Sequence, residues 1–177
     1  MNLTSDQTRV VLDWMRKLHT LDYAHRYEAM AKHRLNILLG APVVIASAVV
    51  GAQIATTSQG DPRARVVIGL MAGIAGVLAA LLTFLKPAEL AEKHRIASVA
   101  YEALRHRLEY LILFDQSEHA EVVDKLDRFR ADWEMLDFPS ISTRRWNQAK
   151  SRVRQVGTYP PTLLLAIAAD VQAVAEG

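Results

Sequence analysis

The stretch that decides the fold is LNILLGAPVVIASAVVGAQIA, Leu35–Ala55, which contains no charged residue. An α-helix needs about 20 predominantly apolar residues to cross the hydrocarbon core of a bilayer. A second uncharged stretch, VVIGLMAGIAGVLAALLTFL, covers Val66–Leu85. Buried helices of soluble bundles usually carry polar residues along one edge at helical spacing, and neither stretch does. We therefore predict two transmembrane helices, at about residues 35–55 and 66–85.

The segment between the two spans, TTSQGDPRAR (Thr56–Arg65), is short and contains the turn formers Gly, Asp and Pro. So short a connection makes the two spans antiparallel neighbours. Lys and Arg are more frequent before the first span and after the second than in this turn, which holds only Arg63 and Arg65. Because Lys and Arg accumulate on the cytoplasmic side, we predict insertion into the inner (plasma) membrane with both termini in the cytoplasm.

Amphipathic helices are predicted on the cytoplasmic side, over residues 5–33, 87–114 and 118–137, with Asp22 as an alternative start of a second helix within the first range. In the second range, apolar residues alternate by three and four and form a seam that includes Tyr101, Leu104, Leu108 and Leu111. This seam is either one side of a helical hairpin within the chain or an oligomer contact. The predicted fold class is all-α, an integral membrane protein with a two-helix transmembrane hairpin and a cytoplasmic helical bundle.

The chain is predicted to divide into a membrane domain, residues 1–145, and a basic tail with a short C-terminal helix, residues 146–177. From Arg144 to Arg154 there are five basic residues and no acidic one. This run is either a solvated face or a contact with anionic lipid headgroups. Nucleic acid is less favoured, because Trp146 is its only aromatic residue.

Composition excludes several classes of protein. The 177 residues include no cysteine, which excludes a disulfide framework, a thiolate nucleophile and cysteine-ligated metal. Basic residues number 21 and acidic residues 19, too small an excess for a strong nucleic-acid argument. The sequence has no phosphate-binding loop, HExxH or GxSxG, and no two of its histidines are three or four residues apart. We therefore expect no enzyme activity, cofactor, metal or specific nucleic-acid site.

Small residues within the spans are candidates for close helix packing, because they let helix backbones approach each other in lipid. They are Gly69, Gly73 and Gly76 in the second span, and Ser47 and Gly51 in the first. They serve either the hairpin itself or contacts between protomers.

Two histidines, His33 and His94, each follow a lysine just outside a span. They are either interfacial or hydrogen-bonded residues, or parts of a cytoplasmic junction between the two stems that also includes Tyr101.

Several short motifs resemble the SLATT domain, the SMODS and SLOG-associating two-transmembrane effector domain. They are the aromatic lead-in with Trp14, Tyr23 and Tyr27, then His33, Asn36 and Leu39–Pro42 entering the first span, then Glu89, His94 and Tyr101 after the second, and the close Phe138–Ile141. The resemblance covers roughly residues 10 to 145.

This resemblance implies a pore-forming or membrane-disrupting effector of a bacterial antiphage or conflict system that responds to a nucleotide signal. It further implies a homo-oligomer in the lipid bilayer and a partner, an operon-encoded signalling or sensor protein. The alternative function is a non-conducting membrane scaffold that recruits a partner through its cytoplasmic helices.

Overall fold

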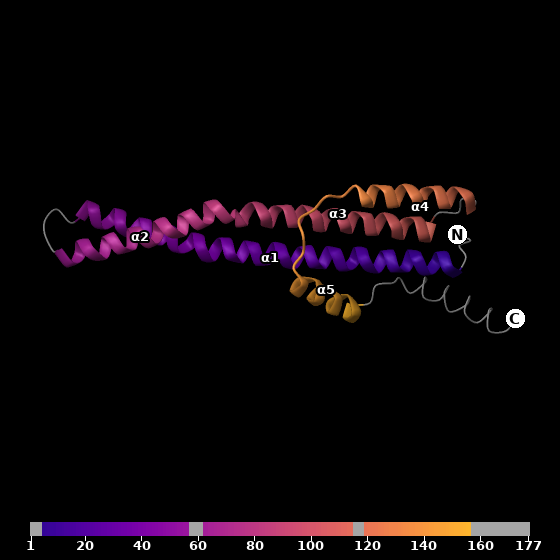
Figure 1. Cartoon of the computed structure of the whole chain (residues 1–177), viewed down its shortest axis with the longest axis horizontal. Helices are drawn as coiled ribbons and strands as arrows, with labels where there is room; N and C mark the ends of the chain where they lie inside the picture. Colours follow the sequence, from indigo (N-terminus) through magenta and orange to yellow (C-terminus); the bar gives the residue numbers. More distant parts are fainter. Residues whose placement is uncertain (1–4, 57–61, 115–118, 157–177) are drawn as a thin grey trace. The chain divides into compact units, whose positions relative to one another are not determined.

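The computed structural model describes residues 5–56, 62–114 and 119–156, and every regular element in these ranges is an α-helix. The helices are α1 (Ser5–Thr56), α2 (Pro62–Leu85), α3 (Pro87–Phe114), α4 (His119–Glu134) and α5 (Thr143–Val156), as Figure 1 shows. The predicted all-α fold with a pair of long apolar helices is confirmed. Half of the predicted turn between the spans lies outside the described residues, and so do residues 115–118 and the predicted C-terminal helix.

Helix α1 continues without interruption through Asp22, the alternative start of a second helix, and directly into the first apolar stretch. Asp22 does not begin a helix: its side chain is buried inside α1, and its Oδ1 accepts a hydrogen bond of 2.7 Å from Nε of Arg26. An ion pair between residues four apart stabilises a continuing helix. Pro42 also lies inside α1, a position that membrane helices tolerate better than soluble ones.

The junction between α2 and α3 is a single residue, Lys86, with a positive φ of 42°. Its N–H donates to the carbonyl of Leu82 at 3.0 Å, and its own carbonyl accepts from the N–H of Leu90 at 3.1 Å. A left-handed residue ends a helix, and the following Pro87 suits the first turn of the next one. Thus local backbone chemistry separates the second apolar helix from α3.

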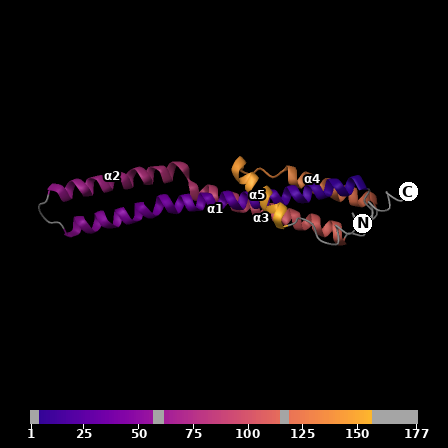
Figure 2. The ribbon, with the colours of Figure 1, turned by 90° about the horizontal axis from the view of Figure 1, so that it is seen from below.

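The described chain forms two compact units. We call Ala29–Glu92 the span unit and the remaining described residues, 5–28, 93–114 and 119–156, the bundle unit. In the span unit, the C-terminal half of α1 and helix α2 run antiparallel and side by side (Figures 1 and 2).

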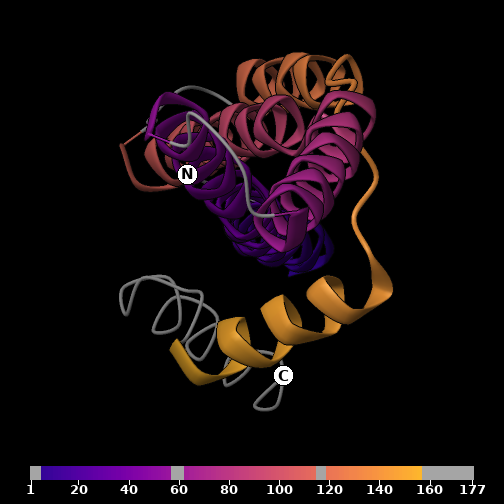
Figure 3. The same ribbon diagram turned by 90° about the vertical axis from the view of Figure 1, so that its left-hand side faces the viewer.

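In the bundle unit, the N-terminal half of α1 packs with α3 and α4, and α5 lies on the side of α1 that faces away from α4 (Figure 3). Its core consists of Val11, Met15, Leu18, Ala97, Tyr101, Leu108, Val122, Leu126 and Phe129. Trp14 stacks on Phe129 with ring centroids 6.1 Å apart and meets Trp133 edge-on at 6.3 Å. The apolar faces of α3 and α4 therefore pack against each other and against α1 within one chain.

The seam on α3 is accounted for by this packing. Leu108 is 0% exposed and Tyr101 is also buried, both in the core, while Leu104 packs against it and Leu111 is half-buried. Since Leu108 is covered within one chain, it is not available to a second copy in this conformation. Of the two alternatives for the seam, the structure has the helical hairpin within the chain.

Candidate functional site

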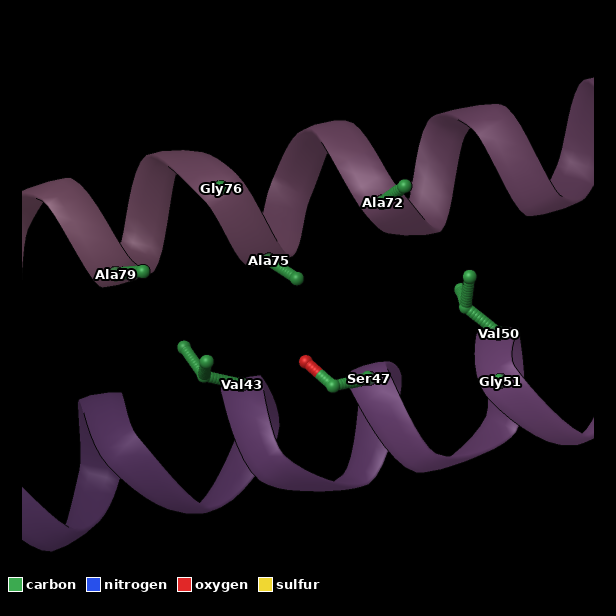
Figure 4. A pocket seen from close by; sticks show the side chains of 8 residues that line it. All are labelled: Val43, Ser47, Val50, Gly51, Ala72, Ala75, Gly76 and Ala79. Atoms are coloured by element: carbon green, nitrogen blue, oxygen red, sulfur yellow. The ribbon is translucent and has the colours of Figure 1, made fainter.

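An open groove runs between the two spans, along one side of their contact. Its volume is about 390 Å³. The lining residues are Val43, Ser47, Val50, Gly51, Ala72, Ala75, Gly76 and Ala79 (Figure 4). Ser47 and Gly51 of the predicted packing set thus face the groove from α1, and Gly76 faces it from α2. The groove is lined by small and apolar residues, and Ser47 supplies a hydroxyl.

The predicted packing glycines do not serve the contact between α1 and α2. A Cβ atom built at Gly51, Gly69, Gly73 or Gly76 would meet nothing within 4 Å. By contrast, a Cβ at Gly40 would meet Cδ1 of Leu82 at 3.9 Å. The hairpin alternative therefore does not explain these glycines. We call Gly69, Gly73 and Gly76, spaced by four and three on α2, the glycine face.

Large apolar side chains cover the rest of the outer surface of the spans. Leu70 and Ile74 are exposed, and Phe84 is 83% exposed. Two helices are long and apolar enough to cross a membrane. In each of them, the share of the most apolar stretch that is buried within the chain is 0%. Monomeric soluble proteins rarely expose apolar patches of this extent. Lipid is therefore the environment that this surface fits.

In the bundle unit, the buried side chains along α1 change from apolar to polar. Val11, Met15 and Leu18 are followed by a set of buried polar residues on α1 and α3, which we call the polar layer: His19, Thr20, Asp22, His25, Glu28, His94 and Ser98. Burial of a polar group is costly unless the group is hydrogen-bonded. The polar layer therefore depends on specific partners, and the arrangement of those partners defines this part of the site.

The centre of the polar layer is a pair of histidines. Nδ1 of His25 lies 2.9 Å from Nδ1 of His94, and both side chains are 2% exposed. Tyr101 stacks on His25 at 5.4 Å, and Phe138 meets His25 edge-on at 6.1 Å. A hydrogen bond between two Nδ1 atoms needs one ring that donates and one that accepts. Burial, and next the proximity of His94, lowers the pKa of His25 to about 4, so His25 is neutral at pH 7.

The predicted cytoplasmic junction is thus only partly reproduced. His94 and Tyr101 lie together around His25, whereas His33 is an exposed residue of the span unit. His25 was missed because its partner is 69 residues away in the sequence. One signal was available: His94 interrupts the apolar seam of α3, and a histidine on a buried face requires a polar partner.

A second contact of the polar layer fixes the start of α5. Oε1 of the buried Glu28 accepts hydrogen bonds from the backbone N–H of Ser142, at 3.0 Å, and from its hydroxyl. The carbonyl of Ser142 in turn accepts from the N–H of Trp146 at 3.0 Å, so Ser142 caps α5. Glu28 therefore holds the N-terminus of α5 against α1.

An ion-pair network ties α1 to α3 at the edge of the polar layer. The Arg26 guanidinium contacts Asp22 at 2.7 Å and Glu102 at 3.0 Å. Burial raises the pKa of Asp22, while the hydrogen bond from Arg26 opposes that rise. Within the described residues, no group of three or more His, Asp or Glu side chains could hold a metal ion.

This architecture defines a class: an all-helical protein with two antiparallel apolar helices long enough to cross a membrane and a separate helical bundle. Residues 16–137 match the model of the SMODS and SLOG-associating 2TM effector domain, in the version named SLATT_fungal. The chain belongs to this family, which confirms the resemblance found in the sequence. Neither the curated proteins nor the solved structures contain a significant match.

Proposed function

We propose that this protein is a membrane effector whose copies assemble through the glycine face and the neighbouring groove and permeabilise the plasma membrane. The observation that carries the proposal is the open space around Gly69, Gly73 and Gly76. Small residues on membrane helices permit close helix contact, and the single chain leaves these three without one. A second copy is the occupant that would give them a packing role.

Several copies are needed, because two antiparallel helices cannot enclose a lumen. The spans contain no charged residue, so neither a charge-selective filter nor a proton relay is part of this proposal. A hydrophobic, gated or disruptive assembly fits these residues better. The Ser47 hydroxyl in the groove is suited to a hydrogen bond between helices of neighbouring copies.

The trigger in this proposal is a signalling or sensor protein. Support comes from the family description, which names association with SMODS and SLOG. The apolar seam of α3 is covered within the chain, which leaves the outer surface of the bundle unit for such a partner.

For orientation, we expect both termini on the cytoplasmic side, because Lys and Arg flank the outer ends of the two apolar stretches. The measurement is a reporter fused to each terminus that is active on one side of the membrane only, combined with alkaline carbonate extraction. Release into the soluble fraction would contradict membrane insertion, and a reporter signal from the far side would contradict the orientation.

For assembly, Gly73→Ile is expected to keep insertion and to lose permeabilisation. The substitution keeps α2 apolar and meets no atom within its own chain, but it holds a neighbouring backbone away. Overpacking of a close contact costs about 1 to 3 kcal/mol, which corresponds to roughly a 5- to 150-fold weaker assembly. The measurement is dye leakage from liposomes at matched protein content, with the genomic partner and its signal present.

The matched control is Val67→Phe, which adds bulk at another exposed position of α2, about 120° around the helix from Gly73. Leakage by this variant should equal that of wild type. Equal leakage by wild type and Gly73→Ile would show that the glycine face is not the assembling contact. If wild type caused no leakage under any trigger, permeabilisation would be contradicted and the alternative function, a non-conducting scaffold, would take its place.

A further inference from the structure

Helix α5 carries an unusual charge for its length. Its 14 residues include Arg144, Arg145, Lys150, Arg152 and Arg154 and no acidic residue. Its apolar side is occupied, because Ala149 and Val153 are buried in the bundle unit. All its cations except the half-buried Arg145 are exposed. Helix α5 therefore presents a basic outer surface from a helix that the fold already holds in place.

The cations of α5 differ from those of the other bundle helices in their partners. Several cations of α1, α3 and α4 pair with acids four residues away, as in Lys17–Asp13, Arg105–Glu109 and Arg130–Glu134. Within the described residues no salt bridge is formed by a cation of α5, and Arg145 instead donates to Gln148 at 2.9 Å. The positive charge of α5 is thus not neutralised within this part of the chain.

The start of α5 is attached to α1 shortly before the first apolar stretch. Glu28, which holds Ser142, precedes Leu35 by seven residues of the continuous helix α1. The first cations of α5, Arg144 and Arg145, follow Ser142 directly.

We propose that the basic outer surface of α5 binds the anionic headgroups of the leaflet on the side of the bundle unit. This proposal rests on the membrane insertion and the cytoplasmic orientation given above, since the cytoplasmic leaflet is the anionic one. Electrostatic attraction to such a surface holds α5 at the membrane without insertion, because Ala149 and Val153 on its apolar side are already buried in the bundle unit.

A lipid surface fits α5 better than nucleic acid does. Single-stranded nucleic acid is bound by cations interleaved with aromatic rings that stack on bases, and Trp146, the only aromatic residue of α5, is half-buried. An anionic bilayer requires only a row of exposed cations within a Debye length, about 10 Å at 0.1 M salt. Glu28, which holds the start of α5, precedes the first apolar stretch by only seven residues in the sequence.

The absence of cysteine from the chain permits a direct test on the full-length protein. Ser151 is exposed on the side of α5 opposite Ala149 and Val153, so Ser151→Cys places one spin label at the centre of the basic surface. The labelled protein is reconstituted in nanodiscs of phosphatidylcholine, or of two parts phosphatidylcholine to one part phosphatidylglycerol. Collision of the label with a water-soluble nickel chelate reports its exposure.

We expect the label to be several-fold less accessible in the phosphatidylglycerol nanodiscs and to regain accessibility at 1 M salt, where the Debye length is about 3 Å. Replacing Arg144, Lys150 and Arg154 by Gln should weaken docking about a hundredfold, at roughly a fivefold factor for each cation near an anionic surface. The control replaces Lys17, Arg128 and Arg130 by Gln, which removes the same charge from exposed positions of α1 and α4 and should leave the protection unchanged.

Equal accessibility in both kinds of nanodisc would overturn the proposal, and so would equal loss of protection in the two triple variants. Binding of a labelled DNA duplex that depends on α5, without any effect of phosphatidylglycerol, would replace the lipid by nucleic acid. Nanodiscs present the same lipids on both faces and require no leakage. A negative result here is therefore separate from a failure of the orientation or of permeabilisation.

Discussion

Leu108→Asp is expected to unfold the bundle unit, with a loss of more than about 4 kcal/mol in the free energy of unfolding. Truncation of a fully buried leucine alone costs about 2 to 5 kcal/mol. A carboxylate at this position would in addition be buried in a core that contains Val122, Leu126 and Phe129, and burial of a charge is costly. The measurement is denaturant unfolding in detergent, followed by the fluorescence of Trp14 and Trp133, which pack against this core.

The control for this variant is Val99→Asp on the same helix. Val99 is 52% exposed, so the new carboxylate is solvated and the expected change is within about 0.5 kcal/mol. A different outcome would revive the oligomer alternative for the seam. If Leu108→Asp kept the cooperative unfolding transition and only reduced the mass of the particle in light scattering, Leu108 would be a contact between chains.

The parts of the fold that the sequence predicts are those that depend on local chemistry. The absence of charge over Leu35–Ala55 and Val66–Leu85 defines the spans without reference to any partner. Pro87 likewise marks the start of α3, because a proline suits the first turn of a helix whatever the tertiary packing. Asp22 was ambiguous for a local reason, since the same residue type caps helices and forms ion pairs within them.

Long-range features could not be predicted in the same way. The spacing of Gly69, Gly73 and Gly76 places them on one face of a helix, but the rotation of α2 about its axis decides whether that face meets α1. The contact between Glu28 and Ser142 joins residues 114 positions apart, and nothing near either residue indicates the other. The His25–His94 pair has the same origin, and it has the largest consequence for the behaviour of the bundle unit in acid.

Acidification from pH 6.5 to pH 4 is expected to destabilise the bundle unit by about 3 kcal/mol through His25. The pKa of His25 is about 4 in the folded protein and 6.5 when unperturbed, so the unfolded chain binds the proton more tightly. Stability from this group is complete above pH 6.5 and is lost as the pH falls towards 4, at 1.36 kcal/mol for each unit. Glu28 on α1 favours the charged ring, but burial and His94 outweigh it.

The measurement is denaturant unfolding at a series of pH values, for wild type and for the double variant His25→Phe, His94→Leu. Because the double variant removes both rings, it leaves neither histidine buried without its partner. Other groups also titrate in this range. Burial raises the pKa of Asp22 and lowers the pKa of His19. Both residues are present in wild type and in the double variant, so their contributions to the pH dependence of stability cancel in the comparison. Between pH 6.5 and 4, the free energy of unfolding of the double variant should fall less than that of wild type, by the amount that His25 supplies.

His106→Gln provides the control for this comparison, because His106 is an exposed residue of α3 that pairs with Glu109 at 3.1 Å. Its stability should follow the wild-type pH dependence. If the double variant and wild type lost stability in parallel below pH 6.5, the buried pair would not be the group that senses acid. If the slope of wild type instead reversed sign, so that the bundle unit gained stability in acid, His25 would be charged in the fold, with its ring proton held by Glu28 against the cost of burial.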